Sequence, residues 1–184
     1  MFSQPKILVC TDFSEGSDKA LRAAKDLAHR TKGEVHLLHV AEISFYLNVC
    51  GYLPELNEQF LNTITDDVVK MMHEQAFRCG VAADVKVVVK NDVLSGVLED
   101  LKELKADIVV IGSKGTSPEL NFYLGSNARK ICSASPVPVL VVNDETSIER
   151  VAALVDADND AEEVLRKAID VNQMYDSRLT VISL

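Results

Sequence analysis

Apolar residues along the first 143 positions follow two alternating patterns. Short, nearly continuous apolar runs are typical of parallel strands buried on both faces of a sheet. These runs lie at residues 6–11, 35–40, 84–89, 108–111 and 137–142. Between them, apolar residues recur every three or four positions, as in amphipathic helices. The predicted helices cover residues 14–31, 54–80, 93–105 and 126–133. The alternation predicts an α/β fold, an open parallel five-stranded sheet with helices on both faces.

Polar residues and glycines at the helix ends predict where the helices begin and stop. Ser14 or Ser17 is a candidate N-cap for the first helix, because a hydroxyl oxygen accepts hydrogen bonds from first-turn N–H groups. Gly33 suits the left-handed residue that follows this helix. Asp92 is expected to begin the turn into the third helix.

Residues 6–40 and 150–184 form an internal repeat. They align without a gap at an offset of 144 residues, and Asp12 falls on Asp156. Five identities in 35 aligned residues would be weak alone, but the shared strand–Asp–helix–strand pattern strengthens them.

The repeat divides the chain into a complete α/β domain at residues 1–143, a linker at 144–149 and a partial second repeat, a βαβ unit, at 150–184. A lone βαβ unit has too little core to be stable by itself. Its predicted strands, 151–155 and 179–184, would leave unpaired edges. We therefore expect this unit to dock on the first domain or on another chain, giving a homodimer or larger assembly. On this interpretation the chain is a truncated tandem protein or a fragment of one.

Composition argues against several classes of partner. Lysine and arginine total 19 against 28 aspartates and glutamates, and the net charge of −9 disfavours non-specific binding to nucleic acid or to anionic membranes. No apolar run approaches the roughly 20 residues that cross a bilayer. The N-terminus has no charged and apolar leader, so we expect a cytoplasmic protein. No two cysteines have C-x-x-C spacing, and Cys10 and Cys132 are expected to be inert core thiols.

The glycine-rich stretch after the fourth strand is the most informative motif. Gly112, Gly115 and Gly125 follow the spacing G-x2-G-x9-G, and Ser126 opens the next helix. Glycines let the backbone approach a ligand closely and adopt positive φ, and a helix N-terminus favours an anion. These residues predict a phosphate site. The alternative is a connection whose glycines serve only to cap the helix.

Charged residues near the same end of the sheet extend this hypothesis. Lys114 and Arg129 add positive charge to the phosphate site. Asp12 ends the first strand, and ligands bind open parallel sheets where the winding of the strands reverses. If the first and fourth strands are neighbours, Asp12 faces Gly112 and accepts hydrogen bonds from ribose hydroxyls or an exocyclic amine. The alternative is that Asp12 only forms the turn before the helix.

Other candidate chemistry is weaker. His36 and His39 are three apart on one strand, so they point to opposite faces and cannot share a metal, and His39 lies nearer the ligand end. The sequence has no G-x4-G-K-[ST] P-loop and no visible nucleophile–base pair. Glu119, the acid in the glycine-rich loop, is a poor general base because a flexible loop would hold it. Any hydrolysis is therefore expected to be slow.

Four stretches resemble the ATP-binding branch of the universal stress proteins. They are ILVCTDFSEGSDKALRAA from Ile7, VHLLHV from Val35, DIVVIGSKG from Asp107 and LGSNARKICSASPVPVLVV from Leu124. The resemblance implies a sheet in the order 3-2-1-4-5, a dimer in most members, and ATP as the ligand. The resulting set of cofactor-binding residues is Thr11, Asp12, Val40, Gly112, Ser113, Lys114, Gly115, Gly125, Ser126 and Asn127. Asn127 departs from the family, which usually has a β-branched residue there.

The sequence therefore predicts an ATP-binding stress or signalling module whose nucleotide occupancy alters its shape or partners. Mg²⁺ would bridge the phosphates instead of being held by protein ligands. No catalytic residue is assigned. Two alternatives remain open: an interaction scaffold of the same fold that binds no nucleotide, and a slow ATPase.

Overall fold

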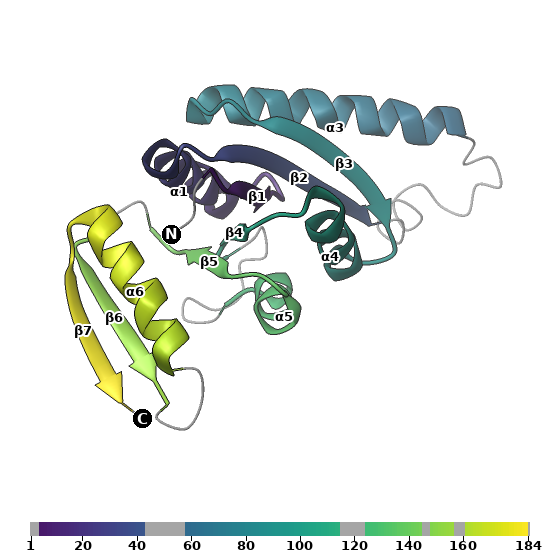
Figure 1. Ribbon diagram of the computed structural model, residues 1–184. Helices are drawn as coiled ribbons and strands as arrows, with labels where there is room; N and C mark the ends of the chain where they lie inside the picture. The colour runs from purple at the N-terminus through teal and green to yellow at the C-terminus, as the bar shows by residue number, and fades with distance from the viewer. Residues whose placement is uncertain (1–3, 43–57, 115–123, 145–147, 157–160, 184) are drawn as a thin grey trace. The chain divides into compact units, whose positions relative to one another are not determined.

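The computed structural model describes residues 4–42, 58–114, 124–144, 148–156 and 161–183. The chain divides into two compact units, Phe2–Glu145 and Thr146–Leu184, and each is described by itself (Figure 1). Within the described ranges, no helix is both long and apolar enough to cross a membrane.

The first unit contains a five-stranded parallel sheet in the order β3-β2-β1-β4-β5, which confirms the predicted fold. Its strands are β1 (Lys6–Cys10), β2 (Glu34–Glu42), β3 (Asp84–Lys90), β4 (Ile108–Gly112) and β5 (Val139–Val142). Its helices are α1 (Glu15–Thr31), α3 (Glu58–Cys79), α4 (Val93–Leu104) and α5 (Ser126–Ala134). Helices α1 and α3 cover one face of the sheet, and α4 and α5 cover the other (Figure 1). The predicted start of the second helix, near Pro54, lies outside the described residues.

The strands bury side chains on both faces because alternate residues point in opposite directions. Leu8 and Leu38 belong to a core cluster with Val97 of α4 and Ile131 of α5. Ile7 and Val9 of β1, which point to the other face, are also fully buried, as expected for a sheet covered on both faces.

The first helix is capped as predicted at its start but not at its end. Ser14 is the N-cap, and its hydroxyl accepts a hydrogen bond from the N–H group of Ser17 at 3.2 Å. The left-handed residue after the helix is Lys32, with φ 57°, so the prediction of Gly33 is wrong. Gly33 is required for another reason. A Cβ there would lie 2.6 Å from the carbonyl oxygen of Pro5, so a larger residue would push the start of β1 away.

The histidines of β2 lie on opposite faces of the sheet, as predicted. His36 lines a cavity with Asp100 of α4. The ring of His39 instead lies 4.9 Å from that of Phe13, in the segment that precedes α1.

Two cysteines expected in the core have different environments. Cys132 is exposed, so its prediction as a core thiol is wrong: it lies on a solvent-facing side of α5. Cys10 is partly buried, and burial, together with the charge of Asp100, raises the pKa of its thiol to about 12. Cys10 is therefore a protonated and inert thiol at neutral pH.

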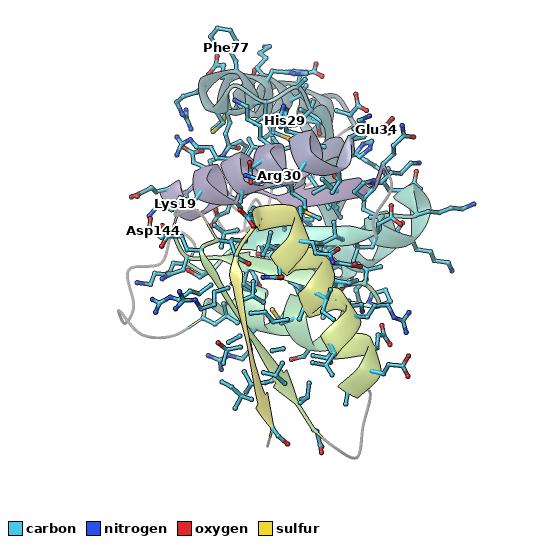
Figure 2. The ribbon with its side chains drawn as sticks, turned by 60° about the vertical axis from the view of Figure 1, so that its left-hand side comes forward. Lys19, His29, Arg30, Glu34, Phe77 and Asp144 are labelled. Atoms are coloured by element: carbon cyan, nitrogen blue, oxygen red, sulfur yellow. The ribbon has the colours of Figure 1, made fainter. Side chains whose placement is uncertain are left out.

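Surface contacts tie the end of β5 to α1. Lys19 of α1 lies 3.9 Å from the carboxylate of Asp144, which follows β5 (Figure 2). On the outer surface of α3, the side chain of Phe77 is 89% exposed and points away from the sheet (Figure 2).

The second unit is a single βαβ element made of β6 (Arg150–Val155), α6 (Ala161–Tyr175) and β7 (Arg178–Ser183). Its two strands form a separate parallel sheet. Arg150 pairs with Arg178, as Lys6 pairs with Glu34 in the first unit. The two strand pairs therefore have the same register: adding the repeat offset to each residue number of a pair in the first unit gives the corresponding pair in the second.

Candidate functional site

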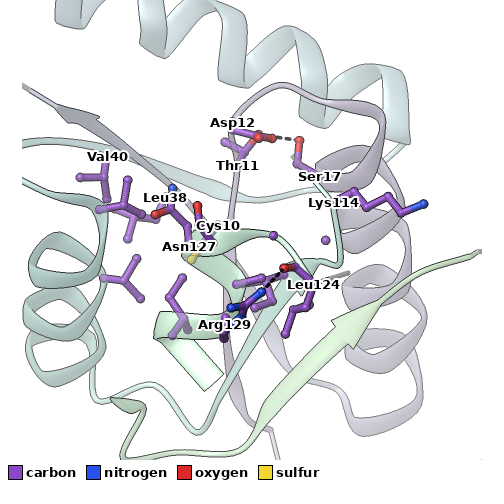
Figure 3. Close-up of a pocket in the computed structure, with 18 of the residues that line it drawn as sticks. Cys10, Thr11, Asp12, Ser17, Leu38, Val40, Lys114, Leu124, Asn127 and Arg129 are labelled. Carbon is purple, nitrogen blue, oxygen red and sulfur yellow. Dashed lines mark hydrogen bonds between the residues drawn. The ribbon is translucent and has the colours of Figure 1, made fainter. Parts of the chain in front are cut away.

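A pocket of about 480 Å³ opens at the carboxyl ends of β1, β2 and β4 (Figure 3). β1 pairs with β2 on one side and β4 on the other, so the winding of the sheet reverses here. Ligand pockets in proteins span roughly 300–1,000 Å³ and favour such positions. The size and place of this pocket suit a small ligand the size of a nucleotide.

Most of the predicted site residues line this pocket. They are Thr11, Asp12, Val40, Gly112, Lys114, Gly125, Ser126 and Asn127. Ser113 does not line it, and Gly115 lies outside the described residues, as does Glu119. The structure thus brings together residues from four separate segments of the chain.

Ser113 holds the loop in place and does not face the pocket. Its hydroxyl donates to Oδ1 of Asn143 at 2.9 Å, and its N–H donates to the carbonyl oxygen of Val142 at 2.8 Å. Its own carbonyl oxygen accepts from the N–H of Gly125 at 2.9 Å. Both donors of Ser113 are therefore engaged within the protein, and the contacts fix the start of α5 against the ends of β4 and β5.

Gly112 is explained by packing instead of by a positive φ. Among the described glycines only Gly80 has a positive φ, and Gly125 has φ −54°. A Cβ on Gly112 would lie 2.6 Å from the carbonyl carbon of Gly16, in the first turn of α1. The expectation that these two motif glycines adopt positive φ is therefore wrong. Gly112 allows α1 to approach the end of β4.

The N-terminus of α5 faces the pocket without a side-chain cap. Gly125 occupies the N-cap position, and Ser126 and Asn127 line the pocket. By contrast, Ser14 caps α1, and Asp92, which was expected to begin the turn into α4, is the N-cap of that helix. The first N–H groups of a helix have no intrahelical acceptor, and the first turn of α5 has no acidic residue. This end of the pocket therefore presents hydrogen-bond donors and the positive end of a helix dipole.

The two basic candidates differ in direction. Arg129 reaches back along α5, and its Nη2 donates to the carbonyl oxygen of Leu124 at 3.4 Å (Figure 3). The exposed side chain of Lys114 extends away from Asn127 and Leu38 (Figure 3). Arg129, not Lys114, therefore directs its side-chain cation toward the N-terminus of α5.

Asp12 lies at the mouth of the pocket and forms the turn before α1. Its Oδ1 accepts a hydrogen bond from the N–H of Ser14 at 3.1 Å, which is the turn-forming alternative raised from the sequence. The same contact fixes the carboxylate at the end of β1, where it lines the pocket. The two roles are therefore compatible.

A buried polar network supports Thr11 behind the pocket wall. The Thr11 hydroxyl donates to Oε1 of Gln75 at 2.8 Å, and Nε2 of Gln75 donates to Ser17 Oγ at 3.1 Å and to Asp18 Oδ1 at 2.7 Å. Gln75 is only 1% exposed. Sequence reasoning missed it, although one polar residue in the apolar stripe of α3 was a usable signal.

His39 adds a neutral imidazole to the pocket wall. The carbonyl oxygen of Thr11 lies 2.9 Å from Nδ1 of His39, so Nδ1 carries the proton and Nε2 is an acceptor. Burial lowers the pKa of His39, and the hydrogen bond to Thr11 and the charge of Asp12 oppose this only in part. His39 is therefore neutral at pH 7.

The rest of the wall is apolar, and sequence reasoning did not assign it. It comprises Leu38, Val93, Val97, Ile111, Leu124, Ala128 and Ile131, together with Cys10. These side chains come from β2, α4, β4 and α5 and meet only in the folded chain. The pocket therefore combines a largely apolar wall with the hydrogen-bond donors at the N-terminus of α5.

Comparison with known families agrees with this architecture. The model of the universal stress protein family matches residues 5–143. The chain belongs to the universal stress protein family. Universal stress protein YxiE of Bacillus subtilis is 31% identical over 145 residues, covering 74% of this chain and 97% of the relative. Universal stress protein MJ0577 of Methanocaldococcus jannaschii is 28% identical over 159 residues, covering 77% of this chain and 96% of that protein.

Solved structures of the family share the fold. MJ0577 superposes with a TM-score of 0.65 at 27% identity, over 78% of this chain and 99% of that one. A universal stress protein in complex with cAMP gives a TM-score of 0.55 at 20% identity, over 77% of this chain and 98% of that one. A family member from Archaeoglobus fulgidus gives 0.73 at 20% identity, over 99% of this chain and 68% of its own length.

Proposed function

We propose that this protein binds ATP in the pocket at the ends of β1, β2 and β4, and acts as a nucleotide-dependent stress or signalling module. The observation that carries the proposal is the polarity of the pocket. The uncapped N-terminus of α5 supplies hydrogen-bond donors, and much of the remaining lining is apolar. A nucleotide needs both, since it joins an anionic chain to a flat and largely apolar base.

Each part of the nucleotide has a matching group. The N–H groups of Ser126, Asn127 and Ala128 have no intrahelical acceptor and suit the phosphates. The Asp12 carboxylate suits the ribose hydroxyls, and the backbone at Val40 suits the edge of the base. Mg²⁺ would be held by the phosphates and water, because this cation usually keeps several waters and binds through substrate phosphates.

The direct test is to denature the purified protein and identify released nucleotide, then to titrate ATP, ADP, AMP and cAMP into nucleotide-free protein by calorimetry. cAMP is included because a structural relative was solved with it. Stoichiometric ATP, or micromolar ATP affinity, supports the proposal. Turnover of bound ATP would favour the slow ATPase. A folded protein without affinity for any of these ligands would refute nucleotide binding and leave the scaffold.

Substitution of the N-cap glycine separates binding from folding. Gly125→Val introduces a branched side chain at the start of α5 and is expected to abolish ATP binding while the protein stays folded. Its φ of −54° is accessible to valine, so backbone strain is not expected. Ser133→Val, at an exposed position of the same helix, is the control and should bind ATP as the wild type does.

We also propose that the protein forms a homo-oligomer through its second unit. A two-stranded sheet with one helix is marginal by itself. Light scattering on the full chain and on a shortened chain ending at Asn143 tests this. A monomeric full chain with protease-sensitive residues 150–184 would contradict the proposal.

A further inference from the structure

The cation at the phosphate end of the pocket occupies an unusual position on its helix. The N–H of Arg129 donates to the carbonyl oxygen of Gly125 at 2.9 Å, so Arg129 lies within the first turns of α5. Its guanidinium turns back toward the helix start and donates to the carbonyl oxygen of Leu124. A cation here opposes the helix dipole, which favours negative charge at this end.

The protein supplies no compensating anion in its described part. The first turn of α5 has no acidic residue, whereas α1 and α6 each begin with two. Among the described residues, Arg129 forms no ion pair with a carboxylate, and its guanidinium makes one long hydrogen bond. A guanidinium has five N–H donors. Arg129 is exposed, and most of its donors are therefore accessible to a ligand in the pocket that it lines.

From this arrangement we propose that Arg129 sets the preference of the pocket for nucleotides with more phosphates. The proposal rests on the proposed nucleotide binding. The helix N–H groups serve a single phosphate equally well in AMP, cAMP and ATP. A guanidinium placed beside them adds charge-assisted, bidentate contacts that become stronger as phosphoryl oxygens and negative charge accumulate. Lys114 also lines the pocket, but its side chain extends away from Asn127 and Leu38 (Figure 3), so we assign this role to Arg129.

The test is calorimetric titration of ATP, ADP, AMP and cAMP into wild type, Arg129→Gln and Lys130→Gln. Lys130 is the adjacent residue of α5; it is exposed and does not line the pocket. Lys130→Gln removes one positive charge, as Arg129→Gln does, and is therefore the matched control. We expect Arg129→Gln to weaken ATP by about 10–100-fold, as for the loss of a hydrogen bond between charged groups. AMP and cAMP should change less than about threefold, and Lys130→Gln should leave the ATP-to-AMP ratio at the wild-type value.

Two further measurements exclude a merely structural role for Arg129. Arg129→Lys keeps the charge but loses the planar fork, so it should recover only part of the ATP affinity. Without ligand, Arg129→Gln should melt at the wild-type temperature or about 1–4 °C higher, because an unfavourable charge–dipole contact is removed.

Distinct results would overturn the inference. Equal losses for ATP and AMP in Arg129→Gln, an equal effect of Lys130→Gln, or a lower melting temperature of ligand-free Arg129→Gln would each contradict it. A wild-type protein that binds none of the four nucleotides would refute the proposed function itself, and this inference with it.

Discussion

Replacing Gln75 with leucine removes a buried amide that joins α3 to α1 and to the end of β1. The wild-type amide accepts from Thr11 at 2.8 Å and donates to Ser17 at 3.1 Å and Asp18 at 2.7 Å. In the variant, the Thr11 hydroxyl can turn toward Ser17 Oγ at 3.1 Å, and Asp18 keeps its two contacts with Arg78 at 2.9 and 3.0 Å. No charge is therefore left without a partner.

The variant loses the stabilisation from two neutral hydrogen bonds and one hydrogen bond to a carboxylate. Burial of a leucine side chain of similar volume offsets part of this loss. Buried neutral hydrogen bonds contribute about 1 kcal/mol each, and those to charged groups about 1.5–3 kcal/mol. The free energy of unfolding should fall by roughly 2–4 kcal/mol after this offset. For a chain of this length, the melting temperature should fall by roughly 4–16 °C.

Urea unfolding followed by circular dichroism measures the change. Glu74→Leu is the matched control, because Glu74 is the exposed neighbour on α3 and its variant adds the same side chain. It should stay within about 0.5 kcal/mol of wild type. If Gln75→Leu is as stable as Glu74→Leu, the buried network contributes nothing and the reasoning is wrong.

Three further predictions concern the same unit. Gly112→Ala should destabilise the protein by about 1–3 kcal/mol in urea unfolding, because its Cβ would meet the Gly16 backbone; an unchanged midpoint would show that α1 moves at no cost. Since burial lowers the pKa of His39, the unfolded chain binds this proton more tightly, and stability should fall as pH drops below 6.5. His39→Asn should reduce that slope, and a slope equal to that of the wild type would contradict the assignment. Asp12→Ala should weaken ATP and AMP alike in calorimetry, and a loss confined to ATP would contradict a contact with the nucleoside.

The sheet and its helices were predictable because their signals are local. Strands buried on both faces are continuous apolar runs, and amphipathic helices repeat every three to four residues. Helix ends were harder, since a glycine serves more than one purpose. Gly33 was expected to be the left-handed residue, but the close approach of Pro5 requires it, and Lys32 adopts that conformation.

Site residues next to the end of a strand or the start of a helix were predictable from the sequence. Site residues brought together by contacts between distant elements were not. Asp12 and Gly125 stand next to a strand end and a helix start, where backbone geometry fixes their place. Gln75 lies 64 residues from Thr11 along the chain, and nothing local to either residue predicts their contact. Likewise, only the folded side chains distinguish Arg129, which turns toward the start of α5, from Lys114, which extends away from Asn127 (Figure 3).

The register of the second unit follows from the spacing of the repeat. Because the segments align without a gap, the same number of residues separates the paired strand positions in each unit, and Leu154 pairs with Ile182 as Cys10 pairs with Leu38. In the first unit, β1 has a second neighbour in β4, whereas in the described residues β6 pairs only with β7. Leu154 and Ile182 lie on one face of this sheet and are 55% and 43% exposed. Because side chains alternate along a strand, Ala153 of β6 points to the opposite face, and it is only 3% exposed. The second unit therefore buries only one face of its sheet within itself, and the apolar residues on the other face would gain stability from a further layer.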